Sequence, residues 1–281
     1  MNTATASVVD PKKELRSLAA TAWEDLAGGL RKTQLWGRIG WLDVKRRYRR
    51  TMLGAFWSSI TLAVYTGSVG IVGAGLFHQN IHNYLPYLIS GMIVWTLLSL
   101  IINEACTLFV AGHALFRNVR FEYSILAYAL VWRNFIVFLH NMAVYALVVA
   151  VLRPELLLDP TLLLAIPGLI LVLVNGVWIA LLIGLLCLRF RDIQQLVQTV
   201  IQILTLVTPI FWSADGLTGL RQLVFVQLNP VYRMIEIVRA PLLGQIPTSS
   251  DYLAALGITI AGWSLSYWMF QNFRKRIAYW S

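Results

Sequence analysis

The sequence predicts an all-α membrane protein with six transmembrane helices. An amphipathic interface helix precedes the first of them, and re-entrant or interfacial helices lie between spans five and six. Two observations support this prediction. Apolar residues make up 58% of the 281 residues and charged residues only 13%, whereas soluble proteins average about 25% charged residues. The apolar residues also gather in long runs after the polar, basic segment 1–50, so a bilayer must cover surface that a soluble fold could not bury.

Six apolar stretches are long enough for crossings of roughly 20 residues each. The first two share a run without charged residues, 51–103, and are separated by a polar turn at 78–86 (HQNIHNYLP). The stretch 213–251 is too apolar for a plain loop and too interrupted for a span, so it is expected to form re-entrant or interfacial helices, or else a loosely packed extracellular cap. We expect the spans at 55–77, 84–103, 124–152, 161–188, 193–212 and 252–273.

The chain is expected to divide into a cytoplasmic N-terminal segment (1–54), a transmembrane domain (55–273) and a short cytoplasmic tail (274–281). Six spans place eighteen of the 23 Lys and Arg residues on the side that holds both termini and four on the other side, with Arg133 inside a span. Basic residues accumulate on the cytoplasmic side of membrane proteins. The sequence therefore predicts a multi-pass protein of the cell inner membrane with both termini in the cytoplasm.

The segment before the first span has the pattern of a helix lying at the membrane surface. Leu35, Ile39 and Leu42 fall on one helical face, with Trp36 beside them. The basic residues around them suit lipid phosphates, although they could serve only to fix the topology. Because this patch adjoins a span, a nucleic-acid partner is not expected. The predicted headgroup-binding residues are Arg38, Lys45, Arg46, Arg47, Arg49 and Arg50.

From this segment onward the sequence resembles the ABC-2 type permeases that export polysaccharides such as O-antigen, capsule or teichoic acid. The resemblance rests first on 43–57 (DVKRRYRRTMLGAFW). It continues through 189–193 (RFRDI) and 208–211 (TPIF), and then through Asn229-Pro230 followed by 239–244 (RAPLLG). These motifs occur in the order and spacing of that family from about residue 35 to the C-terminus.

The resemblance implies a homodimeric permease that works with two copies of an ATP-binding cassette subunit. ATP and magnesium would be bound by that partner, and this chain would hold no cofactor. The dimer would enclose a channel for a lipid-linked polysaccharide. A coupling helix between spans two and three would dock on the ATPase through Leu115, Phe116, Arg117 and Asn118. The periplasmic exit would be covered by a gate that includes Pro209, Phe211, Asn229, Pro230 and Arg239.

Four residues are candidates for the channel itself. Trp57, Trp212 and Trp280 suit an aromatic belt at the membrane interface. Trp95, Trp132 and Trp178 are less easily assigned to it, and indole rings can stack on sugars. A charge at Arg133 needs a partner or a polar cavity. It could contact an anionic substrate, but it lies close enough to the cytoplasmic end to snorkel, which is the interpretation we favour.

The sequence lacks the motifs expected for ATP hydrolysis, metal binding and glycosyl transfer. The chain contains no P-loop motif, so ATP hydrolysis is expected in a partner chain and this chain is not expected to be an enzyme. His78 and His82 lack further zinc ligands, and no metal site is expected. The alternatives are an ABC-2 exporter of a drug or small lipid, an ion-coupled carrier, a scaffold, or a membrane glycosyltransferase acting on a polyprenyl carrier. The last would need paired acidic residues, whereas Glu104, Glu122, Asp192 and Glu236 are isolated.

Overall fold

The computed structural model is all-helical over the residues that it describes, which are 11–47, 49, 54, 56–112, 122–214 and 217–280; no strand occurs within these ranges. Two helices precede the bundle, α1 (Pro11–Arg31) and α2 (Thr33–Arg47). The long helices that follow are α3 (Phe56–Leu76), α4 (Ile81–Ala105), α6 (Ser124–Leu152), α7 (Ala165–Arg189) and α11 (Ser249–Phe273). The shorter elements are η1 (Pro154–Leu158), η2 (Pro160–Leu164), α8 (Ile193–Val207), α9 (Gly219–Gln222), η3 (Leu223–Gln227), α10 (Pro230–Leu242), η4 (Arg274–Arg276) and α12 (Ile277–Trp280).

Five helical stretches within the described residues are long and apolar enough to cross a membrane. They are α3, α4, α6, η2 with α7 (Pro160–Arg189), and α11 with η4 (Ser249–Arg276). The protein is therefore a multi-pass α-helical membrane protein, as predicted. The remaining predicted span, the fifth at 193–212, corresponds to α8, which has 15 residues. A helix of that length measures about 22 Å, which is shorter than a hydrocarbon core of about 30 Å. The count of six spans stays a prediction.

The helix α8 ends five residues before the predicted boundary at 212, because a proline follows its last turn. Thr208 has an extended backbone with ψ of 134°. The residue before a proline is pushed out of the helical region by the proline ring, and that proline is Pro209. The chain then continues as a non-helical segment, 208–212, which is part of the site described below.

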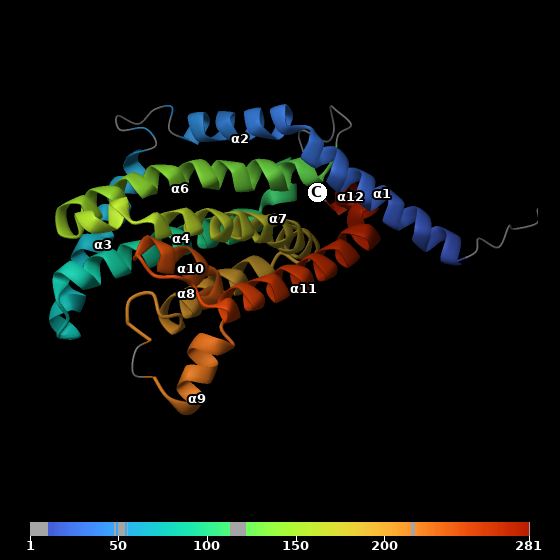
Figure 1. The fold of residues 1–281 in the computed structure, drawn as a ribbon. Coiled ribbons are helices and arrows are strands. Elements are labelled where there is room, and N and C mark those ends of the chain that lie inside the picture. Colours follow the sequence, from blue (N-terminus) through green and yellow to red (C-terminus); the bar gives the residue numbers. More distant parts are fainter. Residues whose placement is uncertain are drawn as a thin grey trace, which may run out of the picture.

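The helices α7 and α11 run in the same direction. At their starts, the hydroxyl of Tyr252 donates a hydrogen bond to the carbonyl oxygen of Leu164 at 3.3 Å. Near their ends, the guanidinium of Arg189 lies 5.0 Å from the ring centre of Trp280. Since the two helices share one direction, the chain between them must return from one end of the bundle to the other. We call the end with Arg189 and Trp280 the α1 end, because α1, α12 and the C-terminus gather there (Figure 1).

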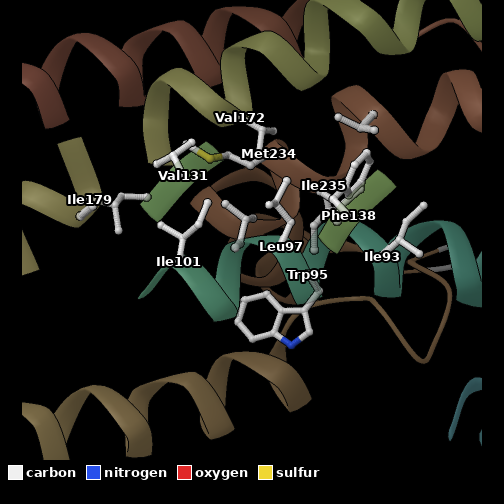
Figure 2. Packing of buried hydrophobic residues seen from close by; sticks show 14 of the residues in the cluster. Ile93, Trp95, Leu97, Ile101, Val131, Phe138, Val172, Ile179, Met234 and Ile235 are labelled. Atoms are coloured by element: carbon white, nitrogen blue, oxygen red, sulfur yellow. The ribbon is translucent and has the colours of Figure 1, made fainter. Parts of the chain in front are cut away.

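The core of the bundle is built around α4, which packs against α3, α6, α7 and α10. More than half of its 25 residues are buried. Figure 2 shows Ile93, Leu97 and Ile101 of α4 among apolar side chains from three other helices, which are Val131, Phe138, Val172, Ile179, Met234 and Ile235. The enclosed position of α4 makes it the element against which the other helices are aligned.

Small residues bring some helices into backbone contact. A Cβ atom added to Gly40 of α2 would lie 2.8 Å from the carbonyl oxygen of Ala129 in α6, and one added to Gly168 of α7 would lie 2.3 Å from the carbonyl oxygen of Ile237 in α10. Consequently α2 lies closely along the first part of α6 (Figure 1). This arrangement brings the polar residues of α2 next to those at the α1 end of the bundle.

Candidate functional site

The helix α8 has a polar surface that no other described part of the chain covers. Its glutamines, Gln194, Gln195, Gln198 and Gln202, are all exposed, and none of their side chains hydrogen-bonds to another described residue. A spacing of three, four or eight residues places them near one another on the helix surface. The opposite flank packs on the bundle through Ile193, Val197, Ile201 and Leu204. We call the exposed set the glutamine face.

The non-helical segment 208–212 after α8 is held by side chains that satisfy its backbone carbonyls. The hydroxyl of Tyr84 donates to the oxygen of Phe211 at 2.5 Å, and that of Tyr87 donates to the oxygens of Pro209 and Trp212, both at 3.2 Å. Because both tyrosines belong to α4, the segment is anchored to the centre of the bundle. Without such partners a buried non-helical backbone would be costly in a membrane.

Arg239 of α10 completes this anchor. It is 1% exposed, and its Nη1 atom donates to the oxygen of Pro209 at 2.7 Å. Its Nε and Nη2 atoms donate to Glu236 at 2.9 and 2.5 Å, and its guanidinium lies 4.4 Å from the ring centre of Tyr87. A buried charge is tolerated only with such complete pairing. The residue therefore links α10 to the end of α8.

The residues predicted to form a gate lie together in the structure. Asn229 donates from Nδ2 to the Oγ1 atom of Thr208 at 3.0 Å, and its Oδ1 atom caps the start of α10 at Val231 and Tyr232. Pro230 is the first residue of that helix. Together with Pro209, Phe211 and Arg239, these residues form one continuous unit, which we call the α8–α10 junction. Its role as a gate stays a prediction.

A charge network joins three helices near the α1 end. Arg133 of α6 donates to Asp43 at 2.8 Å and to Glu104 at 2.6 and 3.1 Å. Glu104 also accepts from Arg47 at 2.5 Å and from Asn134 at 2.8 Å. Arg133 was expected to need a partner or a polar cavity, and snorkelling was the favoured interpretation. In the structure two carboxylates pair with it instead, so its charge is directed into the protein. Likewise Arg47, which was predicted to contact lipid headgroups, is paired with a carboxylate.

The three candidate channel tryptophans lie in different environments. Trp95 is 4% exposed within the core, and Figure 2 shows its indole pointing away from the other labelled side chains. Trp178 donates to Asn175 at 2.6 Å, in a polar group that links α7 to α11 through Thr259. Trp132 packs on the rings of Trp36 and Phe135. The structure does not bring the three together on one surface.

The remaining predicted residues lie on α2, at Arg49 just after its end, or outside the described residues. Arg38, Lys45, Arg46 and Arg49 are exposed, and the last three line a hollow of about 380 Å³ with Leu42. The predicted coupling residues Leu115, Phe116, Arg117 and Asn118 lie outside the described residues, as does Arg50.

Sequence reasoning missed a second polar centre, formed by Asp25 of α1. This buried carboxylate accepts from the backbone nitrogens of Tyr123 and Ser124 at 3.1 and 3.0 Å, and from the Nε atom of Arg274 at 2.7 Å. Asp25 therefore caps the start of α6 and binds the end of α11. The partners lie 98 to 249 residues away in the sequence, and no local pattern indicates them. The glutamine face had a visible signal, four uncharged amides in an apolar stretch, which was overlooked.

Comparison with known proteins gives a family assignment. The family model described as ABC-2 type transporter matches residues 34–243, which is about three quarters of the chain and includes the glutamine face, the α8–α10 junction and the charge network. No curated protein matches the chain.

Proposed function

The chain belongs to the ABC-2 type transporter family, and we propose that it is the permease subunit of an exporter that moves a lipid-linked polysaccharide across the inner membrane. Two copies form the conduit, and both termini lie in the cytoplasm. Permeases of this family normally pair with an ATP-binding cassette subunit. Two copies of that subunit would bind ATP and magnesium and drive transport.

The observation that carries this proposal is the glutamine face of α8. An amide without a hydrogen-bond partner costs roughly 2–7 kcal/mol in an apolar environment, so four of them are not expected to face lipid tails. Polar groups within membrane proteins face cavities, pathways or other chains. A second copy placed against α8 would enclose these amides and leave a polar path between the copies.

The helix α3 offers a second wall for that path. The ring of Tyr65 lies 6.3 Å from the ring of Phe211, so α3 meets the non-helical segment that follows α8. Thr61, Tyr65 and Ser68 are exposed on α3, as is Trp57 nearer its start. Hydroxyls and ring faces together suit a sugar chain, because sugars offer both hydroxyl groups and apolar ring faces. A surface for a drug or a simple lipid would not need so many uncharged hydrogen-bonding groups.

The coupling proposal rests on how the α1 end is assembled. The helix α4 ends just after Glu104, and α6 begins at Ser124. Glu104 is bonded to α2 through the charge network, and Ser124 is bonded to Asp25 of α1. An ATPase docked on the intervening residues Leu115, Phe116, Arg117 and Asn118 would therefore act on α4 and α6 at fixed points. Movement of α4 would reach the α8–α10 junction through Tyr84 and Tyr87.

An enzymatic role is disfavoured for three of the four isolated carboxylates, Glu104, Glu122 and Glu236, by their surroundings. Glu104 pairs with Arg133 and Arg47, and Glu122 pairs with Lys32 at 2.7 Å. Glu236 is held by Arg239. Carboxylates engaged by cations in this way are poor acids or bases for glycosyl transfer.

The test is purification of the tagged chain in mild detergent, identification of its partners, and reconstitution of the complex into liposomes. We expect a P-loop ATPase to co-purify, and ATP-dependent movement of a lipid-linked glycan across the bilayer. Movement of a hydrophobic drug but not of glycan would favour the drug exporter. A chain that purifies alone, under conditions that preserve other transporter complexes, would contradict the exporter proposal.

A further inference from the structure

A second surface lies on the outside of the bundle, apart from α3, α8 and α10. It is a groove of about 1080 Å³ whose walls come from α1, α2, α6, α7 and α11. Arg31 is the one charged residue among the described residues that line it. We call it the aromatic groove, because its lining includes Trp23, Trp36, Tyr128, Trp132, Phe135, Trp263 and Tyr267.

Several polar groups of the groove are already bonded to the protein's own backbone. The Nε1 atom of Trp36 donates to the oxygen of Leu30 at 3.4 Å, and the hydroxyl of Tyr128 donates to the oxygen of Leu26 at 3.1 Å. The hydroxyl of Ser264 is bonded within α11. These groups direct their polar atoms away from a ligand and leave ring faces and aliphatic carbon exposed. A hydrocarbon chain suits such a lining better than a sugar, which would need partners for its hydroxyls.

The position of the groove brings it to membrane lipid. Three of its walls, α6, α7 and α11, belong to candidate spans, whereas α1 lies at one end of the bundle. Arg31 is the last residue of α1 and is exposed, and no described carboxylate pairs with it. The neighbouring Lys32 is occupied by Glu122 at 2.7 Å. The aromatic groove thus combines an apolar surface along the spans with a single guanidinium at its α1 end.

We infer that the aromatic groove binds an anionic phospholipid of the surrounding bilayer, with an acyl chain along α6, α7 and α11 and the phosphate beside Arg31. The rings provide broad contact with the acyl chain, and a guanidinium recognises phosphate. None of the lining residues belongs to α3 or α8. This lipid site is therefore separate from the proposed transport path, and the inference does not depend on the proposed function.

The test uses the full chain in nanodiscs of phosphatidylcholine, titrated with phosphatidylglycerol whose acyl chains carry bromine. Bromine quenches tryptophan emission at contact, and four of the eleven tryptophans line the groove. We expect a saturable component of quenching with the anionic lipid. In the Arg31→Gln variant the apparent affinity for phosphatidylglycerol should fall about fivefold, which is the effect of losing one basic residue near an anionic lipid. Arg191→Gln, an exposed arginine outside both the groove and the predicted headgroup-binding set, should leave that affinity unchanged.

A second pair of variants tests the position of the acyl chain. Val174→Phe with Ser264→Phe fills the groove from two exposed positions and should abolish the saturable component. Ile170→Phe with Leu265→Phe places the same rings on exposed positions of α7 and α11 outside the groove and should preserve it. Circular dichroism confirms the fold of each variant.

Three results would overturn the inference. Quenching that rises linearly with lipid fraction, equally in the filled and the control variant, would indicate unspecific contact with the bilayer. Equal saturation by brominated phosphatidylcholine would remove the role of Arg31. Displacement of the brominated lipid by a polyprenyl phosphate at a far lower concentration would assign the groove to an isoprenoid carrier instead.

Discussion

Two arginines of the bundle connect neighbouring elements through buried hydrogen bonds and ion pairs. Arg239 joins α10 to the carbonyl of Pro209, and Arg133 joins α6 to Asp43 and Glu104. Within a membrane, such charges persist only where carboxylates and carbonyls neutralise and bond them. Their pairing shows that both stabilise contacts between helices, which separates them from the exposed arginines of α2.

The Arg239→Met variant should lose about 3–5 kcal/mol of stability, because it leaves Glu236 and the Pro209 carbonyl without their partner in a buried place. Unfolding of the purified chain by titrated denaturing detergent, followed by circular dichroism, measures this. Arg221→Met changes an exposed arginine of α9 and should stay within about 0.5 kcal/mol of the parent. A loss for Arg239→Met no larger than that of the control would contradict the anchoring role.

The residue scale also shows what the sequence could and could not predict. The cost of a charge in a span indicated that Arg133 needs a partner, but choosing Glu104 and Asp43 requires knowing how α2, α4 and α6 pack. Asp25 gave no signal at all, since its partners are distant in the sequence. The residues of the α8–α10 junction were selected by family resemblance, and their contact with α4 through Tyr84 and Tyr87 was not foreseen.

At the scale of elements, apolar length predicted the bounds of the long helices well, even in α6, which contains Arg133. The expected span 124–152 coincides with α6, Ser124–Leu152. It predicted α8 less well, because the stretch 193–212 contains a proline that ends the helix at Val207 and glutamines that make one face polar. Average hydropathy does not reveal either feature, since both depend on single positions.

The glutamine face yields a prediction for transport. Gln198→Leu with Gln202→Leu should lower the rate of ATP-dependent glycan movement at least tenfold, because the polar lining is replaced by carbon while the packing flank of α8 is unchanged. Val200→Leu with Ile203→Leu alters the exposed apolar flank of the same helix and should keep the parent rate. The rates are compared in liposomes at equal amounts of assembled complex. Equal rates for both double variants would contradict a path along the glutamine face.

The α1 helix yields a second prediction at this scale. Asp25→Ala removes the cap of α6 and the partner of Arg274 together, so α1 and the end of α11 should open more often. Loss of a buried charged partner and of a helix cap predicts at least a tenfold rise in amide hydrogen exchange over Asp25–Arg31 and Arg274–Trp280. Mass spectrometry of peptides measures the exchange. Glu24→Ala, at an exposed neighbour, should change neither segment, and an unchanged pattern in Asp25→Ala would show that α1 is held by other contacts.

At the scale of the whole molecule, the contacts constrain how often the chain crosses the membrane. Asp25 of α1 touches Arg274 at the end of α11, so both lie at the same end of the bundle. The parallel course of α7 and α11 requires the chain to return across the bundle after Arg189 and before Ser249. The helix α8 starts just after Arg189, and the segment that follows it reaches Tyr84 near the opposite end of α4. Short as it is, α8 with the segment 208–212 is therefore the element that can supply a sixth crossing.

This argument predicts the accessibility of single cysteines from the two sides of the membrane. Thr33→Cys and Tyr279→Cys, both exposed positions at the α1 end, should react with an impermeant maleimide only after cells are permeabilised. Gln245→Cys, exposed between α10 and α11, should react in spheroplasts with an intact inner membrane. The native cysteines are buried and should give little background. Five crossings would place Thr33 and Tyr279 on opposite sides of the membrane. The contact between Asp25 and Arg274 forbids that arrangement in a folded chain. Labelling of the two positions from opposite sides would therefore contradict both the six-span topology and the packing of α1.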